Sequence, residues 1–128
     1  MTEDKDLLSK DLCARLPYGV KVKTPYNDAE LIGIVKRKGF KKDVDYIDAV
    51  TNKETYPIQY VQPYLRPMSS MTEEESKQYQ DIEETCQSSF YPSYCHILVD
   101  WLNAHHFDYR GLIEKNLALD CTGLHIYD

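Results

Sequence analysis

The spacing of the apolar residues changes between the two halves of the chain, and this change limits the possible folds more than any other feature. Within residues 18–60 apolar and polar side chains alternate, as in Val20-Lys21-Val22-Lys23. Alternation of this kind is typical of strands with one buried face. Within residues 94–102 apolar side chains recur every three or four positions instead, which is typical of an amphipathic helix. The pattern predicts an α+β protein whose sheet precedes most of its helices.

The first half predicts short antiparallel strands joined by tight turns. We expect strands over residues 20–23, 31–35, 44–50 and 55–58, with turns at 24–28 and 51–54 and a loop at 36–42. Gly33 lies inside a β-branched run, and a glycine there predicts a bulge or a close backbone approach. A sheet of short strands protects its edges by curling. We therefore expect a small SH3-like antiparallel half-barrel.

Helices are expected on both sides of this sheet. Residues 4–15 predict a short N-terminal helix that ends before Pro17. Residues 62–71 contain two prolines and suggest a linker. The C-terminal region predicts three helices, over residues 72–86, 94–104 and 109–116, and a short strand over 124–127.

Particular residues mark the ends of these C-terminal helices. Thr72 and Glu75 have the spacing of a capping box at the start of the first. Ser93 should cap the second helix. Asp108 should cap the third, and Asn116 should end it in the left-handed conformation.

Length and charge describe how the halves are organised. The 128 residues fit a single domain, 1–128. Residues 15–66, the β-rich half, hold 10 Lys+Arg and 6 Asp+Glu, so this half is basic. Residues 67–128, the helical half, hold 3 and 11, so this half is acidic. Opposite charges attract, and we expect the two halves to pack against each other around Trp101.

Sequence composition also suggests where the protein works. The chain has no run of about 18 apolar residues, the length that a membrane helix needs. The first twelve residues, MTEDKDLLSKDL, are too charged for a secretory signal. We expect a soluble cytoplasmic protein with no membrane contact, in which Cys13, Cys86, Cys95 and Cys121 are free thiols.

The sharpest surface feature is the basic segment KRKGFKK, residues 36–42. The chain also holds 11 tyrosines, and tyrosine suits contact surfaces because its ring is apolar and its tip is polar. The candidate binding surface consists of Lys36, Arg37, Lys38, Phe40, Lys41, Lys42, Tyr18, Tyr26 and Tyr46. These cations could guard a solvated hairpin, bind an acidic protein, or bind nucleic acid with Phe40 stacking on a base. The net charge of −6 disfavours nucleic acid.

Signals for catalysis or metal binding are weak. Cys86, Cys95, His105 and His106 are the zinc ligands to consider, but their spacing lacks the usual close pairs. A Cys–His hydrolase would use Cys95 or Cys121 as nucleophile, a histidine as base, and Asp100 or Asp108 to orient it. The five glycines are scattered and form no phosphate-binding loop. We expect no cofactor.

Two segments resemble a known family. PYLRPMSSMTEEE (residues 63–75) and WLNAHHFDYRGLIEKNLAL (residues 101–119) resemble small uncharacterised bacterial proteins that recur among phage-like and mobile-element genes of gut bacteria. The resemblance covers about 32 of the 128 residues. It implies no catalytic residue, because the family motifs carry no known chemistry. One departure is Asn116, where the family pattern has a glycine.

Together these observations favour a non-enzymatic protein-binding or assembly module, with the same chain or another protein as its partner. The tyrosine content and the split charge support this hypothesis. The alternatives are a small Cys/His hydrolase and a nucleic-acid accessory protein that binds through the basic hairpin loop.

Overall fold

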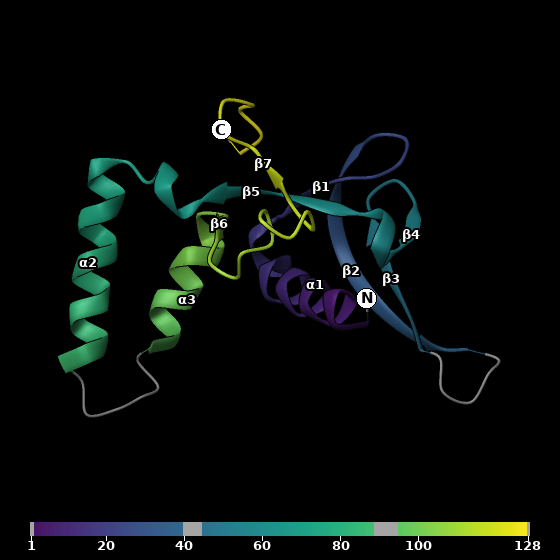
Figure 1. The fold of residues 1–128 in the computed structure, drawn as a ribbon, viewed down its shortest axis with the longest axis horizontal. Helices are drawn as coiled ribbons and strands as arrows, with labels where there is room; N and C mark the ends of the chain where they lie inside the picture. Colours follow the sequence, from purple (N-terminus) through teal and green to yellow (C-terminus); the bar gives the residue numbers. More distant parts are fainter. Residues whose placement is uncertain (1, 40–44, 89–94, 128) are drawn as a thin grey trace.

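The computed structural model describes residues 2–39, 45–88 and 95–127. In these residues the chain forms one open seven-stranded sheet and three α-helices, which confirms the α+β class (Figure 1). The strands are β1 (Lys21–Lys23), β2 (Asp28–Lys38), β3 (Asp45–Thr51), β4 (Thr55–Pro57), β5 (Gln62–Pro67), β6 (Phe107–Asp108) and β7 (Leu119–Asp120). Their order is β4-β3-β2-β1-β5-β6, with β7 paired to β5.

The long strand β2 links the two parts of the sheet. Its first residues pair antiparallel with β1, and its later residues pair antiparallel with β3. The register with β3 shifts between Leu31 and Gly33, which confirms the expected irregularity at this glycine. A Cβ at Gly33 would lie 3.9 Å from Val50, so a side chain would fit there.

Two threonine hydroxyls close the tight turns of the sheet in the same way. The Thr24 hydroxyl donates to the carbonyl oxygen of Asn27 at 2.8 Å and accepts from the Asn27 N–H at 3.1 Å. The Thr51 hydroxyl donates to the carbonyl oxygen of Glu54 at 2.6 Å and accepts from the Glu54 N–H at 3.0 Å. Both threonines are buried, and each buried hydroxyl finds its hydrogen-bond partners in the backbone of its own turn.

Strand β5 corrects the expectation of a linker over residues 62–71. It pairs antiparallel with β1 and parallel with β6 and β7, and a short 3-10 turn, η3 (Met68–Ser70), follows it. The prolines at its second and last residues suggested a linker, because proline cannot donate to a ladder. Pro63 is nevertheless buried opposite Val22.

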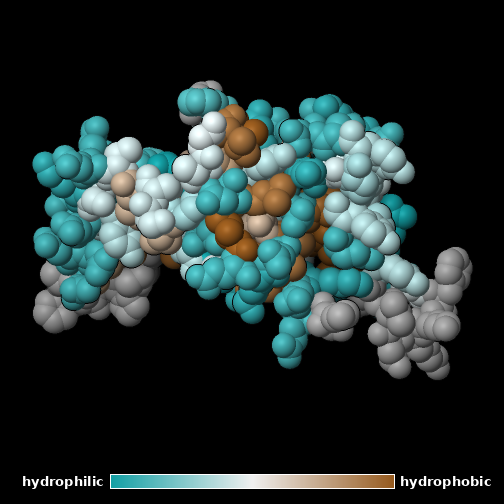
Figure 2. Space-filling view, turned by 45° about the horizontal axis from the view of Figure 1, so that its top comes forward, coloured by the Kyte–Doolittle hydropathy of each residue, from teal (hydrophilic) through white to brown (hydrophobic). Residues whose placement is uncertain are grey.

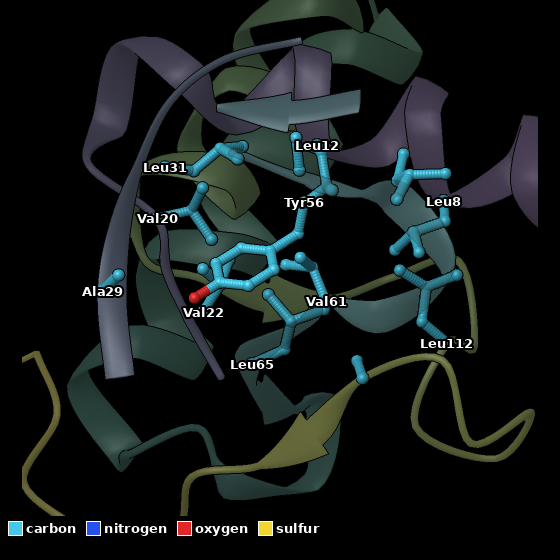
Figure 3. Packing of buried hydrophobic residues seen from close by; sticks show 13 residues of the cluster. Leu8, Leu12, Val20, Val22, Ala29, Leu31, Tyr56, Val61, Leu65 and Leu112 are labelled. Carbon is cyan, nitrogen blue, oxygen red and sulfur yellow. The ribbon is translucent and has the colours of Figure 1, made fainter. Parts of the chain in front are cut away.

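Helix α1 (Thr2–Arg15) covers the sheet and supplies much of the core. Figure 3 shows Leu8 and Leu12 of α1 facing Val61 and Leu65, with Tyr56 beside them. Leu12, Val61 and Leu65 are at most 1% exposed. Full burial of such side chains contributes roughly 1.5–3 kcal/mol each, so this contact is the main apolar support of the fold.

A buried ion network joins α1 to the C-terminal half. Arg15 and Asp11 are both 0% exposed, and the guanidinium donates to the carboxylate at 2.8 and 3.2 Å. Arg15 also donates to the carbonyl oxygen of Phe107 at 2.6 Å, and Arg110 donates to Asp11 at 2.9 Å. Buried charges are tolerated when they are paired and hydrogen-bonded in this way.

Helices α2 (Glu73–Ser88) and α3 (Cys95–Ala104) stand side by side at one end of the molecule. We call this pair the arm; in Figure 1 it lies at the left, while the ends of β2 and β3 lie at the right. The arm joins the rest through Trp101, whose ring lies 6.1 Å from Tyr79 and 5.7 Å from Phe107 between ring centroids.

The expected third C-terminal helix is wrong. Residues 112–116 form turns, and Gly111 before them adopts a left-handed φ of 74° that interrupts a helix. Asn116 does take the expected left-handed conformation, with a φ of 60°. Asp108 does act as a cap, since its carboxylate accepts from the N–H groups of Leu112 and Ile113 at 2.9 Å. The expected strand over 124–127 is also absent from the described residues, where the tail strand is β7 instead.

Trp101 is not at the centre of the core, contrary to the expectation from the sequence. The main core lies between α1 and the sheet, with Leu112 and Ala118 of the acidic half packed into it, and Trp101 is only partly buried. Figure 2 shows hydrophilic residues over the α2 end and apolar residues gathered over the middle of the molecule.

None of the helices in the described ranges has the length and apolar content that crossing a bilayer requires.

Candidate functional site

A cleft of ≈ 670 Å³ lies where three segments meet. Its walls come from the connection between β5 and α2, from the end of α3, and from the C-terminal tail. Residues of the segments 63–75 and 101–119 contribute to it. The residues that matter for its chemistry are Arg66, Thr72, Glu75, His105, His106, Cys121, His125 and Tyr127.

Arg66 and Glu75 form the framework of this cleft. The Arg66 guanidinium donates to both Glu75 carboxylate oxygens, at 2.7 and 2.8 Å, and lies 4.2 Å from the centre of the Phe107 ring. Glu75 also completes the capping box, because it accepts from the Thr72 N–H at 3.0 Å while the Thr72 hydroxyl accepts from the Glu75 N–H at 3.1 Å. The bond from Arg66 lowers the pKa of Glu75 to about 2. The Arg66–Glu75 ion pair connects α2 to the sheet, and both carboxylate oxygens of Glu75 accept hydrogen bonds in it.

The two adjacent histidines have different partners. The Nδ1 atom of His105 lies 2.8 Å from the carbonyl oxygen of Trp101, so Nδ1 carries the proton. His106 has a left-handed φ of 64°, and its ring stacks on Tyr127 with centroids 3.5 Å apart. Burial, together with the nearby cation Arg15, lowers the pKa of His106 to about 4. His106 is therefore neutral near pH 7.

Tyr127 holds the tail over the sheet. Its hydroxyl accepts from the Lys21 N–H at 2.9 Å and donates to the carbonyl oxygen of Tyr64 at 2.6 Å. Lys21 belongs to β1 and Tyr64 to β5. The tail thus bridges two neighbouring strands, and this contact explains why one wall of the cleft is a tail segment.

The cleft brings Cys121 and three histidines into one space, as a Cys–His hydrolase would require. The electrostatics oppose that chemistry. Burial raises the pKa of the Cys121 thiol, whereas a nucleophilic cysteine needs a lowered pKa. His106 is too weak a base at a pKa of about 4.

The other proposed members of the hydrolase site lie elsewhere. The Asp108 carboxylate accepts a hydrogen bond from the Leu112 N–H in the following turn, and Asp100 is exposed on α3. The side chain of Cys95 lies outside the described residues. Of the two proposed nucleophiles, the described one is Cys121, whose environment disfavours the thiolate.

The suggested zinc ligands are dispersed. Cys86 lies near the C-terminus of α2, next to the start of α3 along the chain. His105 and His106 follow the C-terminus of α3, at the other end of the arm. Across residues 2–39, 45–88 and 95–127, no group of three or more His, Cys, Asp or Glu side chains is arranged to hold a metal ion.

The basic segment belongs in part to a strand. Lys36, Arg37 and Lys38 are the exposed last residues of β2, so the expected loop begins later than residue 36. Arg37 lies opposite Tyr46 of β3, and its guanidinium lies 3.1 Å from the Asp48 carboxylate. Because neighbouring side chains in a strand point to opposite faces, Lys36 and Lys38 lie on the other face from Arg37.

The remaining members of the candidate surface are spread over several elements. Phe40, Lys41 and Lys42 lie outside the described residues. Tyr18 is half-buried in the 3-10 turn η1 (Leu16–Tyr18), and Tyr26 is 82% exposed in the turn between β1 and β2. The Tyr26 ring lies 6.3 Å from that of Tyr56. Among the described members, only Arg37 and Tyr46 are direct partners in the sheet.

A second, more apolar hollow lies on the arm. It measures ≈ 240 Å³ and is lined by Asp81, Ile82, Thr85, Cys86 and Ile97. Ile97 and the nearby Val99 of α3 are 41% and 39% exposed. The spacing of apolar residues along each helix does not predict this hollow, because it depends on how α2 and α3 cross.

The chain matches no protein-family model, no curated protein and no solved structure.

Proposed function

We propose that this chain is a non-enzymatic protein-binding or assembly module. The observation that carries the proposal is the apolar hollow on the arm, which leaves Ile97 41% exposed at one end of the molecule. A helix pair that packs only against itself and at its base normally covers its apolar residues. Uncovered apolar side chains rimmed by charged ones mark interaction sites.

An SH3-like half-barrel is the scaffold that we propose for this module. The strand path β4-β3-β2-β1-β5 supports it, since β1 pairs with both β2 and β5. A 3-10 turn, η2 (Ile58–Tyr60), separates β4 from β5, and the irregularity in β2 allows that strand to serve both parts of the sheet. Small barrels of this kind commonly present exposed loops and edges to partners.

The family resemblance is part of the same proposal. Its two segments meet at Arg66, which donates to Glu75 in the first segment and stacks over Phe107 in the second. Both motifs therefore hold the arm on the sheet. That role fits a framework for binding better than a catalytic motif.

The rival functions receive less support from the geometry. The hydrolase would depend on Cys121, whose pKa is raised by burial. Nucleic-acid binding would depend on the basic segment, where Arg37 is already paired with Asp48. The exposed part of α2 repels phosphate, because six carboxylates face a single lysine in its sequence.

Site-specific photo-crosslinking tests the proposal. A benzophenone side chain placed at Thr85, which is exposed and lines the hollow, should give a discrete protein adduct, either in extract of the cells that express the chain natively or with the concentrated purified chain. The same group placed at Lys115, which is exposed on the turn after Leu112, serves as the matched control and should give no adduct. Absence of any adduct from Thr85 under both conditions would contradict the proposal.

A further inference from the structure

We propose that residues 122–127 form a releasable strap over the cleft of ≈ 670 Å³, and that the Tyr127 hydroxyl holds this strap closed. In the released state β1 and β5 bond directly where the hydroxyl now lies, and the cleft opens to solvent. The inference goes beyond the proposed function and does not depend on it, because the described residues that line the cleft and the hollow on the arm are all different.

The Tyr127 hydroxyl occupies a position in the ladder between two strands. Val22 lies opposite Pro63 in the antiparallel register of β1 and β5, and Pro63 has no N–H to exchange. Pairs that exchange backbone hydrogen bonds alternate with pairs that do not, so the next pair, Lys21 with Tyr64, is a position for direct bonds. The hydroxyl bridges this pair instead, since it accepts from the Lys21 N–H at 2.9 Å and donates to the Tyr64 carbonyl oxygen at 2.6 Å.

Release of the strap leaves both strands with their hydrogen bonds. Once the hydroxyl departs, the Lys21 N–H can donate directly to the Tyr64 carbonyl oxygen, so neither group becomes an unpaired polar group. Residues 122–125 are exposed and lose little buried surface on release. The Tyr127 ring opposes release, because it stacks on His106 with centroids 3.5 Å apart and planes inclined by 8°. Two arrangements with similar hydrogen bonding make a two-state element.

The strap borders the part of the cleft that holds Cys121 and His106. Cys121 is 7% exposed, and the buried Nδ1 of His106 has no hydrogen-bond partner among the described residues. Burial, with a smaller contribution from the nearby Cys121 thiol, raises the pKa of Tyr127. The chain before the strap is anchored separately, because the Cys121 N–H donates to the carbonyl oxygen of Leu65 at 2.9 Å. The strap can therefore open after Cys121 while β7 stays in the sheet.

Acid favours the released strap, because the closed strap keeps His106 neutral. The charged and titratable groups around the stacked rings come from α1, from β5, from the residue after α3 and from the tail, and they are Arg15, Asp11, Arg66, His105 and Cys121. Burial, then Arg15, His105 and Arg66, lower the pKa of His106 to about 4. Release admits water to the ring and moves this pKa toward 6.5. Between these values release takes up a proton, so it becomes more favourable as the pH falls.

Two glycine substitutions test the strap without touching its contacts. Gly123 has a φ of +79° and a Cβ there meets nothing within 4 Å, so Gly123→Ala strains only the backbone of the closed strap. Gly111→Ala is the matched control, because Gly111 has a φ of +74° and equally open surroundings but lies outside the strap. At pH 7, Gly123→Ala should raise the rate at which a thiol reagent modifies Cys121, relative to Cys13, at least about fivefold. Gly111→Ala should leave this ratio unchanged.

The hydroxyl is tested by Tyr127→Phe, which removes only the oxygen atom. This variant should raise the same rate ratio about tenfold, because the bridge to both strands is lost, while the closed strap remains its main state. In the wild-type chain, relaxation-dispersion NMR of the Gly123 N–H should show that the released fraction rises from pH 7 to pH 5, at most about twentyfold. A released fraction that does not change with pH would overturn the acid coupling.

The new ladder bond can be detected directly by NMR. The scalar coupling through a hydrogen bond from the Lys21 nitrogen to the Tyr64 carbonyl carbon should be absent from the wild-type chain and present in Tyr127→Ala. The coupling from the Cys121 nitrogen to the Leu65 carbonyl carbon should be present in both chains, because β7 stays in place. Should Tyr127→Ala fail to fold, Tyr127→Phe at pH 5 replaces it.

Three outcomes would overturn the strap. Equal acceleration at Cys121 by Gly123→Ala and Gly111→Ala would show that the thiol reacts through unfolding of the whole chain. A wild-type rate ratio in both Gly123→Ala and Tyr127→Phe would show that the strap does not open. A folded Tyr127→Ala chain without the new coupling would show that β1 and β5 do not bond directly on release. None of these results bears on adducts at Thr85 in the hollow on the arm, so the proposed function is tested separately.

Discussion

The Arg15 guanidinium donates a 2.6 Å hydrogen bond to the carbonyl oxygen of Phe107, 92 residues further along the chain. This bond connects α1 to the segment that supports the arm. It also places a charged side chain, 0% exposed, at the centre of the fold. The position of the arm therefore depends on a buried ion network as well as on apolar packing.

Replacement of Arg15 by Met should lower the free energy of unfolding by about 3 kcal/mol, because it leaves the Asp11 carboxylate buried with a single remaining cation, Arg110. Urea denaturation measures the change. Lys10→Ala, an exposed substitution on the same helix, should stay within about 0.5 kcal/mol of the wild type. An Arg15→Met variant as stable as this control would show that the network does not support the fold.

Gly19 should tolerate substitution poorly. Its φ is +73°, and an added Cβ would lie 3.2 Å from the Glu30 carboxylate. Gly19→Ala should therefore cost about 1–2 kcal/mol in thermal or urea unfolding. Gly33→Ala is the matched control, since a Cβ there has ordinary contact with Val50 at 3.9 Å. Equal losses from the two substitutions would contradict the backbone assignment at Gly19.

Glu75 should titrate far below an ordinary glutamate, at a pKa of about 2 rather than 4.5, because Arg66 donates to it. A lowered folded pKa stabilises the protein above pH 4.5, and this contribution is lost as the pH falls from 4.5 toward 2. Carboxyl-carbon NMR measures the titration. Glu75→Gln should remove that part of the acid sensitivity, whereas Glu74→Gln on the exposed face should not. A Glu75 pKa near 4.5 would rule out the ion pair in solution.

His106 should remain neutral until the pH approaches 4, since burial lowers its pKa from 6.5 to about 4. The folded chain then binds fewer protons than the unfolded chain between these values. The stabilising contribution is complete above pH 6.5 and falls as the pH drops from 6.5 toward 4. Tyr127→Ala should uncover the ring and move its pKa back toward 6.5 in an NMR titration. Tyr127→Phe, which keeps the stacked ring, should leave the pKa near that of the wild type.

Cys121 should react slowly with thiol reagents. It is 7% exposed and burial raises its pKa, whereas Cys13 is exposed on α1. At pH 7 an aromatic disulfide reagent should modify Cys13 at least about tenfold faster, as peptide mapping of the labelled chain would show. Faster modification of Cys121 than of Cys13 would return the Cys–His hydrolase to consideration.

Local patterns predicted the elements that local chemistry determines. Val20 and Val22 marked the first strand, and the Thr72–Glu75 capping box marked the start of α2 within one residue. The irregularity at Gly33 was also foreseen. In each case the deciding interactions lie within a few residues of the signal.

Features that depend on distant contacts were missed. The prolines of residues 62–67 suggest a linker, yet pairing with β1, β6 and β7 makes this segment the strand β5. The pattern of charged and apolar residues over 4–15 does not predict that Arg15 is buried, because its partner Phe107 lies 92 residues further along the chain. The turn after Asp108 replaced a helix because Gly111 takes a left-handed φ of 74°. In the candidate surface, Arg37 lies opposite Tyr46 because of the register of β2 and β3, and the hollow on the arm depends on the crossing of α2 and α3.

The most direct test of the central claim, that the hollow on the arm is an interaction surface, is methyl NMR of the labelled chain. The signals of Ile82 and Ile97, which line the hollow, should shift either between about 10 µM and 1 mM of the purified chain, a range that covers weak association, or on addition of extract from the cells that express the chain natively. Signals of Leu12 in the core and Leu124 on the tail should stay fixed. Fixed signals at Ile82 and Ile97 under both conditions would contradict the account.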